Sequence, residues 1–69
     1  RPDNQQIHAL LDIYGLIGLD AMRTAYRRIY PRRPPFAQPL GLDAQQVLVD
    51  AAPAATQERV RALAARIGS

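Results

Sequence analysis

Arginine is the residue type in this sequence that is best placed to bind a ligand. Five of the nine basic residues fall within eleven positions, and none of the six acidic residues lies among them: Arg23, Arg27, Arg28, Arg32 and Arg33. Guanidinium groups clustered in this way can bind the phosphates of a nucleic acid or an acidic partner. The alternative is a solvated helix face beside a solvated loop, which is the commoner role of a run of charge. Every basic residue is arginine and alanine is abundant, which indicates genome composition rather than selection at each site.

No set of side chains has the composition of a catalytic centre. Catalysis needs a nucleophile with a base, a pair of carboxylates or a metal ion. The only serine is Ser69 at the end of the chain, and the acidic residues are scattered. Without cysteine, His8 alone cannot form a metal site, and Gly15-x-x-Gly18 has too few glycines for a phosphate-binding loop. We therefore expect a protein that is not an enzyme and that uses no cofactor, metal or small-molecule substrate.

The strongest periodic pattern predicts a first helix over residues 4–14. Apolar residues recur at helical spacing and form one broad stripe: Ile7, Leu10, Leu11, Tyr14 and Ile17, widened by Ile13 and Leu16. A stripe this wide predicts a helix that is central in a bundle or that buries surface against a second copy. His8 adjoins the stripe and could switch its charge at an interface, but a half-exposed surface position explains it better.

A second helix is predicted over residues 20–29. Asp20 is a good N-cap, because its carboxylate can accept a backbone N–H and suits the positive end of the helix dipole. The apolar stripe consists of Met22, Ala25, Tyr26 and Ile29. The three arginines of the segment fall off this stripe and should face water. Tyr30 precedes Pro31, which disfavours helix and ends the segment near residue 29.

The turn between these helices is expected to be short. Gly15 or Gly18 can end the first helix in a left-handed C-cap, so the two helices should be neighbours packed at an angle. The DNA-binding helix–turn–helix motif needs a small residue before the turn and apolar residues after it. Counted from Gly15, two of these positions hold Leu11 and Thr24, so the DNA-reading signature is not matched.

A proline-rich connector is predicted over residues 31–39. Four prolines in nine residues exclude helix and favour an extended, partly polyproline-like segment. Phe36 is the only phenylalanine of the chain, and we expect it to fix the connector to the helical core. Arg28, Pro31 and Pro34 also match the spacing that SH3 grooves bind, but this pattern is short and common by chance.

Two further helices are predicted over residues 43–51 and 56–67. The tetrapeptide Gly-Leu-Asp-Ala occurs at Gly18 and again at Gly41, which indicates one N-capping solution used twice. Thr56 is the expected N-cap of the last helix, with Asp50 as the alternative, and Gly68 is its expected C-cap. The apolar positions of the two helices are Ala44, Val47, Leu48 and Ala51, then Val60, Leu63, Ala64 and Ile67.

Three segments are similar to the dimerisation region of the Mor-type phage transcription activators: Ile17-Gly18-Leu19-Asp20-Ala21, Ile29-Tyr30-Pro31-Arg32-Arg33-Pro34 and Leu40-Gly41-Leu42. The similarity spans about a third of the chain. Those proteins usually have a glycine pair where Arg27-Arg28 stand here, and their C-terminal DNA-reading unit has no counterpart. The resemblance implies dimerisation and does not extend to DNA reading.

Length and composition limit the remaining choices. A single domain of 69 residues rarely gains more than about 3–5 kcal/mol from its core, and no disulfide can reinforce it. A net charge of +3 is basic but moderate. No apolar run approaches the ~20 residues of a membrane span, so we expect no membrane association. The lack of cysteine fits a cytoplasmic location.

We therefore predict an all-α fold, a small bundle of four short helices with a proline-rich crossover between the second and third. The leading function is a non-catalytic protein–protein interaction module, such as a docking, adaptor or dimerisation domain, for a protein partner or a second copy. The expected contact residues are Tyr14, Ile17, Tyr30 and Phe36. The alternative is a nucleic-acid-binding domain of the regulatory, phage or plasmid type that uses the arginine cluster.

Overall fold

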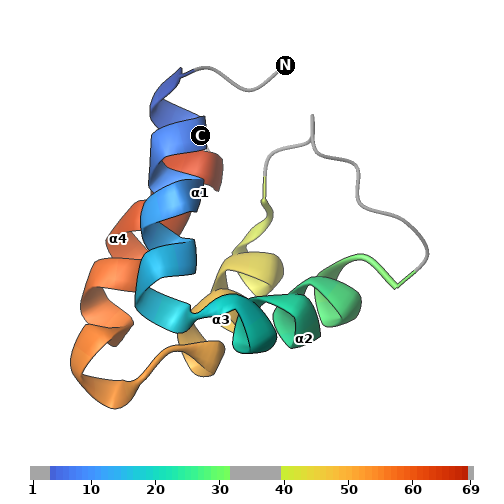
Figure 1. The fold of residues 1–69 in the computed structure, drawn as a ribbon. Helices are drawn as coiled ribbons and strands as arrows, with labels where there is room; N and C mark the ends of the chain where they lie inside the picture. Colours follow the sequence, from blue (N-terminus) through green and yellow to red (C-terminus); the bar gives the residue numbers. More distant parts are fainter. Residues whose placement is uncertain (1–3, 32–39, 69) are drawn as a thin grey trace.

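The computed structural model describes residues 4–31 and 40–68, which form four α-helices and one 3-10 turn (Figure 1). The elements are α1 (Asn4–Ile17), α2 (Leu19–Ile29), α3 (Leu42–Ala51), η1 (Ala54–Thr56) and α4 (Gln57–Gly68). The described residues contain no strand. The predicted all-α fold is confirmed, whereas most of the predicted connector, including Arg32, Arg33, Pro34 and Phe36, lies outside the described residues.

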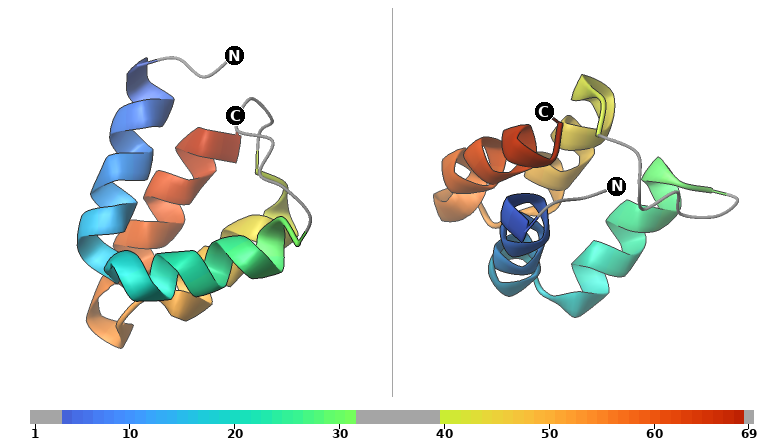
Figure 2. Two further views of the ribbon diagram at one scale, coloured as in Figure 1. Left: turned by 45° about the vertical axis from the view of Figure 1, so that its right-hand side comes forward. Right: turned by 90° about the horizontal axis from the view of Figure 1, so that it is seen from above.

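The helices pack in an order that differs from their order in the chain. α1 and α4 lie side by side and run in opposite directions (Figures 1 and 2). α2 lies across the end of this pair, and α3 packs against both α2 and α4. The contact between α1 and α2 is smaller than the contact between α1 and α4, although α2 follows α1 directly.

Apolar side chains from all four helices form one core. Its members are Ala9, Ile13, Ile17, Met22, Ala25, Leu40, Leu48, Val49, Ala52, Val60, Leu63 and Ala64. No polar or charged side chain of the described residues is buried among them. The alanines let helices approach closely but bury little apolar area each. The stability of the core therefore depends mainly on its larger side chains, of which Ile13, Met22, Leu48, Val49 and Val60 are the most completely buried.

The buried face of α1 differs from the predicted stripe. Ala9, Ile13 and Ile17 are buried at intervals of four residues, whereas Ile7 is 43% and Leu11 is 61% exposed. Apolar residues cover so much of this helix that periodicity alone does not select the buried side. The small Ala9 lies at the N-terminal end of the buried face, where it permits close packing of the neighbouring helix.

Both Gly-Leu-Asp-Ala segments begin a helix, but the aspartate is not the N-cap. Gly18 and Gly41 occupy the N-cap positions of α2 and α3, and neither helix has a side-chain cap hydrogen bond. Asp20 and Asp43 lie in the first turn, where a negative charge still suits the helix dipole. Gly18 has a φ of 94°, which glycine adopts without strain. Gly18 is therefore the single residue between the end of α1 and the start of α2.

The last helix starts as predicted, but Thr56 and Gly68 do not have the predicted roles. α4 begins at Gln57, directly after Thr56, and the Thr56 hydroxyl donates to the Pro53 carbonyl at 2.9 Å as part of the η1 turn. Asp50, the alternative N-cap, lies inside α3. Gly68 is the last residue of α4 and not a cap beyond it. The end of α2 at Ile29 agrees with the prediction, and the Tyr30 N–H donates to the Tyr26 carbonyl at 2.7 Å.

Candidate interaction surface

All three tyrosines of the chain meet where α1 contacts α2. The rings of Tyr14 and Tyr26 have centroids 6.2 Å apart and are tilted by 50°. Tyr26 and Tyr30 pack edge to face, with centroids 5.8 Å apart and planes at 76°. Such pairs contribute about 0.5–1.5 kcal/mol beyond their area burial. Each ring packs against the core and is partly exposed, so the cluster joins the interior to the surface.

The phenols of Tyr26 and Tyr30 stay neutral well above physiological pH. Burial raises the pKa of Tyr26 to about 12, and the neighbouring Tyr14 and Tyr30 and a hydrogen bond with the Tyr14 side chain act in the same direction. Burial also raises the pKa of Tyr30. The cluster therefore offers a partner apolar ring surface together with neutral hydroxyl groups.

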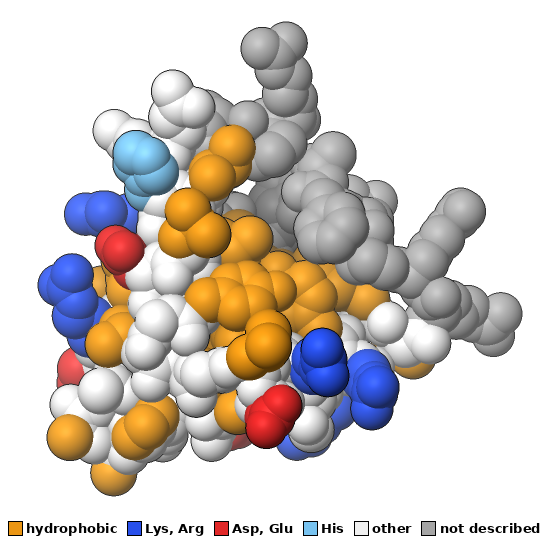
Figure 3. Space-filling model, in the orientation of Figure 1, with side chains coloured by type: hydrophobic (Ala, Val, Ile, Leu, Met, Phe, Trp, Pro, Cys, Tyr) orange, Lys and Arg blue, Asp and Glu red, His pale blue; other side chains and the backbone are white. Residues whose placement is uncertain are grey.

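An exposed apolar stripe of α1 continues from the tyrosine cluster. Ile7, Leu11 and Tyr14 follow one another at intervals of four and three residues, so they share one side of the helix. Figure 3 shows apolar side chains along α1 down to its junction with α2. We define the α1–α2 face as the surface formed by Ile7, Leu11, Tyr14, Tyr26 and Tyr30.

The described arginines of α2 lie on two different flanks of the helix. Arg23 and Arg27 are one turn apart and precede Tyr26 and Tyr30 by three residues, so they border the α1–α2 face. Arg28 lines the groove on the opposite flank, between α2 and α3. All three are exposed, and none forms an ion pair within the part of the chain that the structure describes. Basic side chains gather over α2 at the edge of the apolar area in Figure 3.

The groove between α2 and α3 has a volume of about 310 Å³. It is lined by four apolar and three polar residues, namely Ala21, Ala25, Val47, Ala51, Thr24, Arg28 and Asp50. The polar residues of this set are exposed, and the described residues contain no buried side-chain polar atom without a hydrogen-bond partner. The polar side chains of the groove are therefore accessible to solvent.

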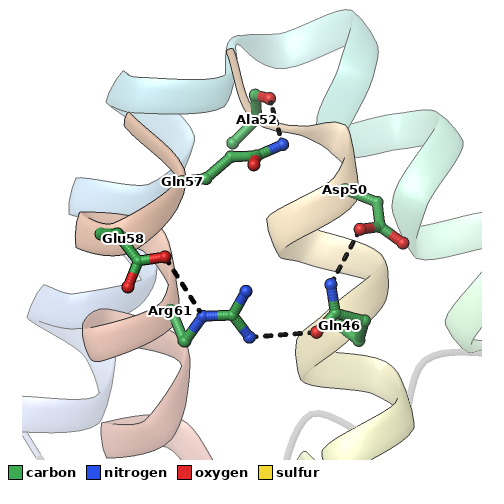
Figure 4. A network of polar contacts seen from close by, with 6 residues as sticks. All are labelled: Gln46, Asp50, Ala52, Gln57, Glu58 and Arg61. Carbon is green, nitrogen blue, oxygen red and sulfur yellow. Dashed lines mark hydrogen bonds and ion pairs between the residues drawn. The ribbon is translucent and has the colours of Figure 1, made fainter. Parts of the chain in front are cut away.

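Polar contacts on another side of the molecule join α3 to α4 (Figure 4). The Arg61 guanidinium donates to the Gln46 side-chain oxygen at 3.0 Å, and the Gln46 amide donates to the Asp50 carboxylate at 2.8 Å. Arg61 also forms an ion pair with Glu58 at 3.6 Å. These groups are engaged with one another, so this side offers fewer free charges than the flank of α2.

The structure brings together part of the predicted contact set. Tyr14 and Tyr30 lie in one cluster, and Phe36 lies outside the described residues. Ile17 is only 9% exposed and belongs to the core, which leaves it almost no surface for a partner. The sequence-based prediction omits Tyr26, which stands between the other two tyrosines. The sequence signal that could have found Tyr26 is its four-residue spacing from Tyr30, because residues at this spacing lie on one side of a helix.

A membrane-spanning helix and a cluster of metal ligands are both absent from the described residues. None of the described helices has the length and apolar character needed to cross a bilayer. No group of three His, Asp or Glu side chains among them is arranged to hold a metal ion.

A scan against protein-family models, a search of curated proteins and a search of solved structures found no match. The resemblance to the Mor-type activators has no support from these comparisons. Function therefore has to be inferred from the surface of the molecule.

Proposed function

We propose that the chain is a non-catalytic interaction module that binds a protein partner through the α1–α2 face. The observation that carries this proposal is the exposure of Ile7 and Leu11 on a helix that buries Ala9, Ile13 and Ile17. A domain with few large core residues gains stability by burying apolar side chains, yet the fold leaves these two in water. Contiguous exposed apolar surface is typical of a site that another molecule covers.

The composition of the face also supports a protein partner. Tyrosine is enriched at protein interfaces because its ring buries apolar area while its hydroxyl can form a hydrogen bond. A single exposed apolar residue is common on any protein surface. Leu42, for example, is 82% exposed, but it stands at the start of α3, which contributes no aromatic residue. Leu11 differs because it continues an aromatic cluster.

Nucleic-acid binding is a second candidate, favoured by the exposure of Arg23 and Arg27 side by side without ion pairs. Arg28 faces the other flank of α2, so the helix does not present a row of three. Two phosphate contacts correspond to a log–log salt slope of roughly −2 on duplex DNA, which is a weak electrostatic contribution. The apolar face therefore supports a protein partner more strongly.

A peptide selection tests the proposal whatever the identity of the partner. A random peptide library displayed on phage is selected on the immobilised chain, and the selected peptides are measured against Leu11→Gln and Leu42→Gln. Leu42→Gln is the matched control, since it removes a more exposed leucine from another helix. We expect Leu11→Gln to weaken binding by about tenfold or more and Leu42→Gln to leave it unchanged. A library that yields no peptide sensitive to Leu11→Gln would contradict the proposal, provided that unfolding curves show both variants to be folded.

Sedimentation equilibrium at low and high salt separates the kinds of partner. The chain lacks cysteine, so no disulfide can complicate the measurement. The lack of cysteine also leads us to expect a reducing, cytoplasmic setting. A dimer that persists at high salt and is broken by Leu11→Gln would identify the partner as a second copy. A monomer that binds random duplex DNA, releases it as salt rises and is indifferent to Leu11→Gln would replace the proposal by nucleic-acid binding.

A further inference from the structure

We infer that the partner segment is an acidic amphipathic helix, which packs along α1 and places its carboxylates on Arg23 and Arg27. This inference rests on the proposed function of the α1–α2 face and specifies the chemistry of the occupant. Two features carry it, which are the helical spacing of the exposed apolar residues and the basic charge along one edge of the face.

The apolar stripe of α1 is suited to a helix. Ile7, Leu11 and Tyr14 span about two turns, or roughly 10 Å along the axis. Ridges with this spacing pack against the grooves of another helix. The described residues contain no strand, so they offer no sheet edge to which an extended segment could add. The backbone of α1 is already used in helical hydrogen bonds, and recognition has to come from side chains.

The charge at the edge of the face selects an acidic partner. Arg23 and Arg27 are exposed and form no ion pair within the described residues. The five members of the face carry no charge at neutral pH. Asp20 lies on the same flank of α2 in the first turn, so the edge keeps an excess of one positive charge. A helix with Glu beside its apolar stripe complements this edge, whereas one with Lys meets a like charge.

The effect of the Asp20 charge on binding distinguishes an acidic helix from a second copy of the chain. In a twofold contact the same surface meets itself, so Asp20 of one copy would be attracted to Arg23 or Arg27 of the other. Loss of the Asp20 charge would then weaken association. Towards an acidic helix Asp20 is a repulsive neighbour, and its loss should strengthen binding.

The test uses two synthetic peptides of about 16 residues, roughly four helical turns. Both carry leucines at helical spacing, and one has Glu and the other Lys at the flanking positions. Binding to the isotope-labelled chain is followed by NMR. The Glu peptide should shift the amide signals of Ile7, Leu11 and Tyr26, bind about tenfold more tightly than the Lys peptide, and weaken as salt rises.

Charge variants locate the carboxylates. The double variant Arg23→Gln with Arg27→Gln should weaken the Glu peptide about three- to tenfold. The matched control, Arg28→Gln with Arg59→Gln, removes two exposed arginines elsewhere and should have little effect. Asp20→Asn should strengthen binding slightly. Equal binding of the two peptides, equal effects of the two double variants, or a dimer weakened by Asp20→Asn would each overturn the inference.

Failure of this inference is distinguishable from failure of the proposed function. Library peptides that depend on Leu11 but are not acidic would reject the acidic helix and retain the interaction face. Absence of any Leu11-dependent peptide would reject both.

Discussion

The rings of Tyr14 and Tyr26 join α1 to α2, with their centroids 6.2 Å apart and their planes inclined at 50°. α1 and α2 otherwise share a smaller contact than α1 shares with α4. The ionisation state of one phenol therefore bears directly on how well these two helices dock.

Stability should fall at alkaline pH because of Tyr26. Burial raises its pKa to about 12 in the folded chain, whereas an unfolded tyrosine has a pKa of about 10. The stability that depends on the neutral phenol is therefore complete below about pH 10 and is lost as the pH rises through about 12. Denaturant unfolding across this interval should show a smaller loss for Tyr26→Phe than for the wild type. Equal losses would contradict the assigned environment of Tyr26.

The two sides of α1 should respond differently to the same substitution. Ile13 is fully buried, whereas Ile7 is 43% exposed. Ile13→Val removes a core methyl group and should lower the free energy of unfolding by about 0.5–1.5 kcal/mol. Ile7→Val should change it by less than about 0.5 kcal/mol. Chemical denaturation of both variants measures the difference, and a larger effect at Ile7 would place the predicted stripe, rather than the observed face, in the core.

Substitution by alanine should lower the stability of the domain at Gly68 and raise it at Gly15. A Cβ at Gly68 would overlap the Gln45 side chain and approach the Leu40 carbonyl oxygen to 2.9 Å. The Gln45 amide donates to that same carbonyl, so it cannot move without losing a hydrogen bond. Gly68→Ala should destabilise the domain by about 1–3 kcal/mol. Gly15→Ala, in an open position of α1, should stabilise it by about 0.5–1 kcal/mol. Thermal unfolding of the pair measures both signs, and equal shifts would contradict the packing of the end of α4.

The contact between Arg61 and Gln46 should contribute little to stability. The side chains of Arg61 and its other partner, Glu58, are 52% and 89% exposed. A double-mutant cycle with Arg61→Ala and Gln46→Ala should give a coupling free energy of about 0.2–1 kcal/mol. High salt should leave most of the total stability intact, because the core contains no buried charge among the described residues. A coupling well above this range would mean that the α3–α4 contact depends on polar groups.

Helix positions could be predicted from the sequence because local residues determine them. Gly18 ends α1 by taking a positive φ, and Tyr30 before Pro31 ends α2. The sequence favours Asp20 and Asp43 as caps because their side chains can accept a backbone N–H. The glycine two residues before each one takes that position instead, and the aspartates keep only their dipole role. The predicted starts of α2 and α3 are each wrong by one residue because of this competition. The predicted end of the first helix at residue 14 is wrong by three residues, because α1 continues through Gly15 to Ile17.

The residues of the α1–α2 face could be predicted only in part, because the exposure of a side chain depends on which helices pack against each other. Tyr14 and Tyr30 carry the aromatic signal in the sequence itself. The assignment of Ile17 to the core and Leu11 to the surface follows from the packing of α1 on α4, which no local pattern specifies. Likewise, Arg27 and Arg28 are adjacent in sequence but border different surfaces, since one residue turns the helix by about 100°.

The packing of α1 on α4 also has a consequence for synthesis of the protein. All residues from Gly18 to Thr56 separate these two helices in the chain. As the polypeptide leaves the ribosome, Ile13 and its neighbours on α1 have no native partner on α4 until that helix has also emerged. Native packing of α1 on α4 therefore has to wait until α4 has been made, and until then the apolar side chains that face α4 are exposed surface of the kind that favours aggregation.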